Sequence, residues 1–161
     1  VIVSPLKPVE IVVGKIASAI IITLFELTLM IFITLFYFHV PFAGSLVVLY
    51  IASFLFLLSL AGIGISISIL CETQQQAILG VFLFLTPAFL LSGQMTPVEN
   101  MPYIMQKICM VNPLTYFFVL TKGIFLKDIS LLYIVQNLIP LVIIAIITIT
   151  FSIWFFDKKI E

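Results

Sequence analysis

Apolar residues fill four blocks of the chain, and polar or proline-containing segments separate them. A transmembrane helix needs about 20 mostly apolar residues, and the blocks at 16–38, 45–70 and 131–156 reach that length. The remaining apolar run, 77–91, is short for a span, so its helix is expected to begin among the glutamines at 74–76, whose side chains can lie among lipid headgroups, which gives a span at 74–91. The pattern therefore predicts an all-α, polytopic membrane protein with four transmembrane helices.

The segment 92–130 is amphipathic and punctuated by prolines, so it differs from the blocks around it. Thr96-Pro97-Val98-Glu99 matches a capping box, which predicts that a short helix begins there or after Asn100. A second helix is predicted from Asn112 as a cap and Pro113 as the first helical residue. We expect two short re-entrant or interfacial helices on the extracellular side. An ordinary extracellular loop with two surface turns fits the same pattern.

The first fifteen residues combine prolines with charged side chains, as in a segment at the membrane interface. Pro5 and Pro8 should interrupt any long helix, although Pro8 also suits the first turn of a short helix leading toward the first span. We interpret 1–15 as a cytoplasmic elbow, with a plain juxtamembrane linker as the alternative. Because the chain starts at Val1 without a signal peptide, we expect it to be the C-terminal part of a longer protein.

Composition places this chain in a cell membrane as a multi-pass protein. Hydrophobic residues make up 63% of it and charged residues 9%, whereas soluble proteins have about a quarter charged. The net charge is zero, so no basic surface is predicted for nucleic acid. Cys71 and Cys109 fall on opposite sides of the membrane in this topology and should be free thiols. Under the positive-inside rule, the side with more lysines is cytoplasmic. Four lysines fall on the side assigned to the cytoplasm, Lys7, Lys15, Lys158 and Lys159, and three fall outside, Lys107, Lys122 and Lys127.

Glu26 lies near the middle of the first predicted span. An ionisable group at the bilayer centre costs about 2.5 to 3.5 kcal/mol on insertion scales, so Glu26 should face the bundle interior. It is a candidate for the translocation path. The alternative is a structural hydrogen bond to a neighbouring helix, through groups such as Ser59, Ser66 or Thr86.

Small residues recur at spacings of three or four in the second span. Such residues let two helix backbones approach closely in a membrane. They predict a packing face composed of Ser59, Gly62, Gly64, Ser66 and Ser68.

Together, the elbow and the insert resemble the C-terminal half of the type-2 permease family of ATP-binding cassette (ABC) exporters. The resemblance covers nearly the whole chain. The residues that carry it are Ser4-Pro5-Leu6-Lys7-Pro8, Glu10, Gly14-Lys15, Ser92-Gly93, Pro97, Met101-Pro102, Gln106, Asn112-Pro113-Leu114-Thr115-Tyr116 and Gly123-Ile124-Phe125-Leu126-Lys127.

Members of this family have six spans and cytoplasmic termini, so the resemblance implies that the four spans here are the third to sixth. It also implies a second permease subunit, forming a homodimer or heterodimer, and cytoplasmic ABC ATPase subunits. The residues implied to couple to the ATPase are Ser4, Pro5, Leu6, Lys7, Pro8, Glu10, Gly14 and Lys15. The residues assigned to an extracellular gate are Ser92, Gly93, Pro97, Met101, Pro102, Asn112 and Pro113.

We therefore expect the membrane subunit of an exporter, with the lipid bilayer as its surroundings and no covalent chemistry of its own. The sequence has no G-x-x-x-x-G-K-[ST] loop, so ATP would be used by the partner subunit and no cofactor or metal is expected to bind directly. A non-transporting scaffold or assembly subunit is the main alternative. An intramembrane enzyme would need H-E-x-x-H or paired acids within the bilayer. The sequence has a single histidine, and its predicted spans contain a single acid, so this interpretation is disfavoured.

Overall fold

The computed structural model describes residues 8–40, 42, 44–126 and 130–160, and within these ranges the regular structure is helical. Three helices are long and apolar enough to cross a membrane, over Val13–Phe36, Leu46–Leu70 and Leu131–Phe156, or up to four if a pair bent by 77° counts as one span. That pair is α4 and α5. The elements are α1 (Pro8–Phe36), α2 (Leu46–Leu70), α3 (Gln74–Leu90), the 3-10 helix η1 (Val98–Asn100), α4 (Tyr103–Cys109), α5 (Pro113–Leu126) and α6 (Leu131–Ile160).

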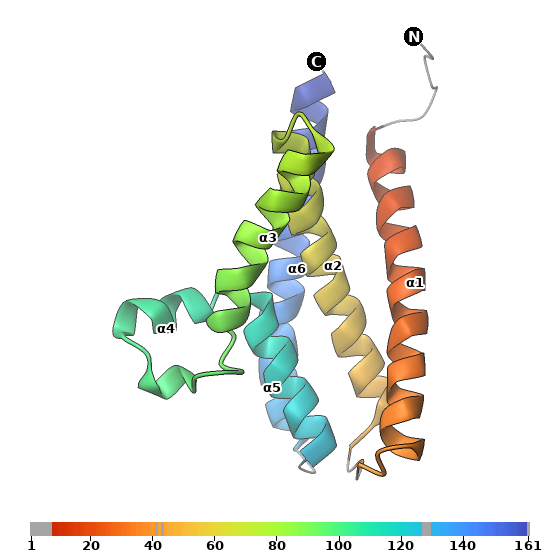
Figure 1. The fold of residues 1–161 in the computed structure, drawn as a ribbon, viewed down its shortest axis with the longest axis vertical. Helices are drawn as coiled ribbons and strands as arrows, with labels where there is room; N and C mark the ends of the chain where they lie inside the picture. Colours follow the sequence, from red (N-terminus) through yellow and green to blue (C-terminus); the bar gives the residue numbers. More distant parts are fainter. Residues whose placement is uncertain (1–7, 41, 43, 127–129, 161) are drawn as a thin grey trace.

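The long helices run side by side, and the start of α1 lies at the same end of the bundle as the end of α6 (Figure 1). α1 descends to the opposite end, α2 returns, and α6 spans the same length. α3 descends only part of the way, and α5 continues along the remaining length (Figure 1). Between them, η1 and α4 project sideways from the bundle. The predicted third span, 74–91, is the single helix α3, which covers only part of the length of the bundle (Figure 1).

The closest helix pair is α2 and α6, and it is built on small residues. Ala52, Ser59 and Gly62 of α2 are buried, as are Ala145 and Ser152 of α6. A Cβ atom on Gly62 would lie 2.8 Å from the Thr148 carbonyl carbon, so the two backbones approach closely at this level. Sequence analysis correctly predicted a packing face here, but Gly64 has open space around it and Ser68 is exposed.

The other packing clusters attach α1 and α5 to this pair. Ile16 and Ile20 of α1 pack near the chain ends against α2 and α6, through residues such as Leu58 and Ile153. Near the opposite end, Ile31 of α1 joins a cluster that also contains Leu49 of α2 and Ile124 of α5. In the middle, Leu120 of α5 and Leu141 of α6 are fully buried beside Ala52. α2 thus contacts every long helix of the bundle.

Several predicted helix ends are confirmed. α3 begins at Gln74, where the Thr73 side chain and the Gln76 amide form a capping box. α5 begins at Pro113, and the Asn112 side chain accepts the backbone N–H of Leu114 at 3.1 Å. Cys71 and Cys109 are free thiols, as predicted.

The position of Pro8 in the first turn of a helix that leads toward the first span is also confirmed, because α1 begins at Pro8 and continues without a break to Phe36. One local prediction is wrong. The predicted capping box at Thr96 and Glu99 does not form, because the chain there makes only the three-residue η1, whose N-cap is Pro97 and has no side-chain cap.

Candidate functional site

The most distinctive polar arrangement lies where α3 ends. The last carbonyls of a helix have no partner within it, and water is scarce inside a membrane, so other groups must supply donors. Three side chains do so here. The Ser92 hydroxyl donates to the Phe89 carbonyl at 2.6 Å, the Cys109 thiol to the Leu91 carbonyl at 2.7 Å, and the Asn112 amide to the Ala88 carbonyl at 2.6 Å. We call Ser92, Cys109 and Asn112 the α3 cap cluster.

The α3 cap cluster ties the sideways segment to the bundle. Cys109 is the last residue of α4, and Asn112 directly precedes α5. Asn112 joins two helices, because its amide nitrogen donates to a carbonyl of α3 while its amide oxygen caps the start of α5. All three side chains are buried. Removing the Cys109 or Asn112 side chain would take a donor from the Leu91 or Ala88 carbonyl, whereas the Phe89 carbonyl would keep the backbone N–H of Ser92 at 3.2 Å.

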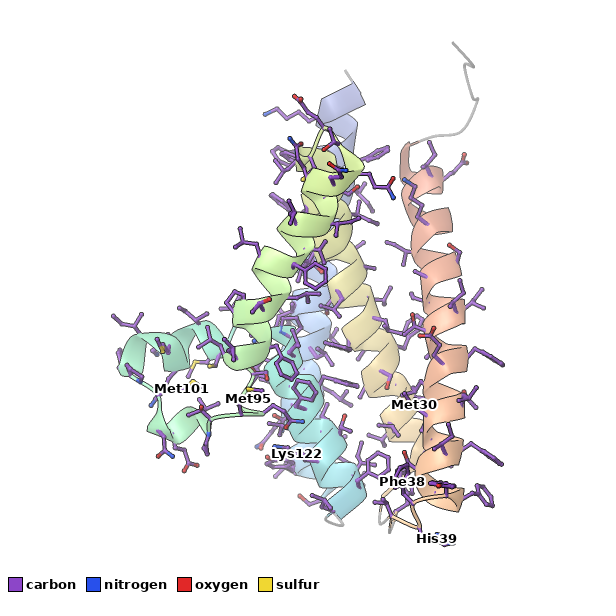
Figure 2. The ribbon with its side chains drawn as sticks, viewed as in Figure 1. Met30, Phe38, His39, Met95, Met101 and Lys122 are labelled. Carbon is purple, nitrogen blue, oxygen red and sulfur yellow. The ribbon has the colours of Figure 1, made fainter. Side chains whose placement is uncertain are left out.

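Other signature residues shape the chain around this cluster. Gly93 has φ +81°, a left-handed conformation that favours glycine, and a Cβ there would also contact Val98 at 3.0 Å. Met101 is buried, and Figure 2 shows it together with Met95 in the segment beside α3. Pro113 is fully buried, whereas Pro97 and Pro102 are exposed. Five of the seven residues assigned to the gate thus lie on or beside the α3 cap cluster.

Polar side chains also satisfy the carbonyls around the short α4. Gln106 donates to the Met101 carbonyl at 2.9 Å, and the Tyr116 hydroxyl donates to the Met110 carbonyl at 2.7 Å. Beside this segment lies an apolar cavity of about 360 Å³, bounded by parts of α2, α3, α4, α5 and α6. Asn112 and Thr148 bring the polar atoms to its otherwise apolar wall.

Sequence analysis missed the role of Cys109. It considered this residue only as a free thiol, because a lone cysteine in an apolar helix carries no spacing signal. Its position three residues before Asn112 could have placed the two on one helical face. The structure instead ends α4 at Cys109 and still directs both side chains to α3.

Glu26 lies apart from the α3 cap cluster, on α1. The prediction that it faces the bundle interior is not met in this chain, where its side chain is exposed. Among the described residues it forms no hydrogen bond, and Ser59 and Ser66 donate instead to carbonyls of their own helix. It lines an open cavity of about 510 Å³ between α1, α2 and α5. The face of α1 that packs against the bundle contains Leu24, Leu27 and Ile31, and Glu26 lies beside that face.

Four of the predicted ATPase-coupling residues are described, namely Pro8, Glu10, Gly14 and Lys15, and they lie at the end of the bundle where α1 begins (Figure 1). Ser4, Pro5, Leu6 and Lys7 are outside the described residues. Pro8 opens α1, and Glu10 and Lys15 are exposed within its first turns. A Cβ on Gly14 would meet no atom within 4 Å, so this glycine is not required by packing within the chain. The structure does not bring the four described residues of this set near the α3 cap cluster or Glu26 (Figure 1).

Comparison with known proteins identifies the class to which this architecture belongs. The sequence profile of the ABC-2 type transporter family matches residues 1–126, which is most of the chain. The protein is therefore a multi-pass membrane protein, and it belongs to the ABC-2 type transporter family. No solved structure matches the chain significantly.

Relatives in Escherichia coli strain K12 carry permease names. The chain is 43% identical to "Probable multidrug ABC transporter permease YbhR" over 158 residues, which is 98% of this chain and 43% of that protein. It is 30% identical to "Probable multidrug ABC transporter permease YbhS" over 79% of this chain and 34% of that protein. It is 33% identical to "Inner membrane transport permease YhhJ" over 76% of this chain and 33% of that protein. The chain thus spans less than half the length of these relatives.

Proposed function

We propose that this chain is part of the membrane-spanning permease subunit of an ABC exporter, which moves substrate out of the cell using ATP hydrolysis by a separate ATPase subunit. The observation that carries the proposal is the 43% identity to a named ABC transporter permease over 98% of the chain. The family match over residues 1–126 supports the same conclusion. The partners proposed are a cytoplasmic ABC ATPase and a second permease subunit.

The cytoplasmic end in this proposal is the one where α1 begins and α6 ends. Lys15 lies near the start of α1 and Lys158 near the end of α6, so both lysines favour this end for the cytoplasm. Figure 2 shows His39 and Phe38 at the opposite end, which would face outward. The exposed Glu10 would then lie on the side of the membrane where the ATPase binds.

The segment from Ser92 to Pro113 would serve as the outer gate. Its support is its position at the break between α3 and α5, part of the way along the bundle (Figure 1). Helix α4 and the start of α5 are held to α3 by the side chains of Cys109 and Asn112. A change at this break can shift α5 without unwinding α3, because no helical backbone ladder joins them.

ATPase coupling provides the direct test. The full-length permease is purified with its ATPase, and retention of the ATPase and ATP turnover in lipid vesicles are measured for wild type and for Glu10→Lys. We expect Glu10→Lys to lower ATPase retention, because it reverses an exposed charge on the proposed docking segment. Glu99→Lys is the matched control for ATPase retention alone, since it reverses an exposed charge in η1, which belongs to the proposed gate and lies far along the chain from the docking segment.

Two results would contradict the proposal. If the wild-type permease retains no ATPase, the scaffold alternative is favoured over a transporter. If the ATPase is retained but Glu10→Lys and Glu99→Lys behave alike, the coupling role of the α1 start fails while the permease assignment stands.

A further inference from the structure

The cavity at Glu26 has a chemical character that the permease assignment does not explain. Glu26 is the only ionisable side chain among the described residues that line it. It lies in the central part of the apolar span Val13–Phe36. A charged side chain at this depth is unfavourable unless an opposite charge or hydrogen-bond donors accompany it. Among the described residues it has neither.

The other polar groups of the cavity are also electron-rich. The Thr23 hydroxyl donates its hydrogen to the Ala19 carbonyl at 2.9 Å, and the Ser53 hydroxyl donates to the Leu49 carbonyl at 2.7 Å. Each hydroxyl therefore presents only its lone pairs to the cavity. Together with the carboxylate of Glu26, these oxygens offer acceptors without a free donor. Such a site favours a cation and repels an anion.

The remaining wall is apolar and partly aromatic. Phe56 of α2 and Phe117 of α5 both line the cavity, and their rings stack with centroids 4.2 Å apart at an angle of 6°. Met30 of α1 adds a flexible apolar side chain, and Figure 2 shows it on the half of α1 nearer the outward end. Aromatic faces attract organic cations, and this attraction strengthens where water is excluded.

We propose that this cavity binds lipophilic organic cations that carry aromatic rings, with the Glu26 carboxylate compensating their charge. A lipid acyl chain would fill the apolar walls but would leave the carboxylate without a partner. A lipophilic anion would meet only acceptors. As a statement about what the permease transports, the proposal rests on the exporter function above, whereas the binding itself does not require it.

Charge-selective binding tests this proposal. The full-length permease, purified with its ATPase, is titrated with tetraphenylphosphonium and with tetraphenylborate, which share a shape and differ in the sign of their charge. We expect wild type to bind the phosphonium in preference to the borate. Glu26→Gln should weaken phosphonium binding about tenfold, which corresponds to about 1.4 kcal/mol for a desolvated cation site. Glu26→Asp should retain the preference because it keeps the charge.

Glu72→Gln is the matched control, because Glu72 is an exposed acid in the turn between α2 and α3, outside the cavity. It should leave phosphonium binding unchanged. Equal binding of the two probes by wild type, or equal losses in Glu26→Gln and Glu72→Gln, would overturn the proposal. ATPase retention is measured on the same samples. An intact complex without charge-selective binding contradicts the cation site alone, and a missing ATPase contradicts the exporter function.

Discussion

At the end of α3, individual side chains donate the hydrogen bonds that water would supply in a soluble protein. The carbonyls that end α3 are satisfied by Ser92, Cys109 and Asn112 rather than by solvent. Asn112 makes two such hydrogen bonds, because its amide nitrogen donates to the Ala88 carbonyl of α3 and its amide oxygen accepts the Leu114 N–H of α5. A buried acceptor that loses its donor is destabilised by its full desolvation penalty.

Replacing Asn112 should therefore lower stability markedly. Asn112→Ala removes the donor to Ala88 and the cap of α5, and we expect the free energy of unfolding to fall by about 1 to 3 kcal/mol. Unfolding by denaturing detergent, followed by circular dichroism, measures the change. Asn137→Ala is the control, because the Asn137 amide donates only to the Tyr133 carbonyl of its own helix. Equal losses in the two variants would contradict a special role for Asn112.

At the scale of elements, the central contact is the close approach of α2 and α6. The two glycines of α2 differ sharply in their surroundings. A Cβ on Gly62 would lie within 3 Å of Thr148 and Ile149, whereas a Cβ on Gly64 would meet nothing within 4 Å. Replacing each glycine with alanine therefore distinguishes two effects on stability, the close approach of the backbones at Gly62 and the helix propensity that both positions share.

We expect Gly62→Ala to destabilise the protein by about 1 to 3 kcal/mol, because the added methyl group forces the two backbones apart. Gly64→Ala should be neutral or stabilising by up to about 1 kcal/mol, since alanine is the better helix former. Detergent unfolding of both variants, under identical conditions, gives the comparison. Similar changes in the two would show that α2 and α6 do not rely on this close approach.

The sequence predicted elements better than their orientations. The helix starts at Gln74, Pro113 and Leu131 are confirmed because caps, prolines and polar turns act locally. The direction that each side chain faces was harder to predict. Lipid and protein core are both apolar, so the residues of α1 carry little signal that separates its two faces. This is why the exposed position of Glu26 was missed, and why Gly62 and Gly64 looked equivalent.

The residues of the candidate site were selected from the sequence, but their contacts were not. Ser92, Gly93, Met101, Asn112 and Pro113 were assigned to a gate through the family resemblance, and that role stays a prediction. The bonds from Cys109 and Asn112 to α3 span 18 and 24 residues. No local pattern encodes such distant partners. The break between α3 and α5 was likewise visible only as an apolar run that seemed short for a span.

At the scale of the molecule, the two ends of the bundle should face opposite sides of the membrane. Cys71 lies in the turn between α2 and α3, at the end where α1 begins, and Figure 2 places His39 at the other end. Two variants, Glu72→Cys and His39→Cys, are made in a background with Cys71→Ala and Cys109→Ala. A membrane-impermeant maleimide should label His39→Cys in intact cells and Glu72→Cys only after the membrane is opened.

Labelling of both positions from one side would contradict the arrangement in which α2 crosses the membrane between them. Labelling with the two sides exchanged would preserve the crossing but reverse the proposed cytoplasmic end. In either case the labelled positions lie on exposed residues, so access is not limited by packing within the chain.

The division between α3 and α5 also affects how the protein responds to mechanical load. α2 is one unbroken helix of 25 residues, and α6 is one of 30 residues whose hydrogen-bond ladder lacks the N–H of Pro140, so bending either helix breaks further backbone hydrogen bonds. Between Leu90 and Pro113 the chain has only the short pieces η1 and α4. A force that pulls α5 away from α3 would therefore act first on the few side-chain hydrogen bonds at the end of α3. α1 is likewise one unbroken helix, over 29 residues. The bundle therefore has three stiff members, α1, α2 and α6, and thickening or thinning of the surrounding bilayer should be absorbed by the compliant route from α3 to α5.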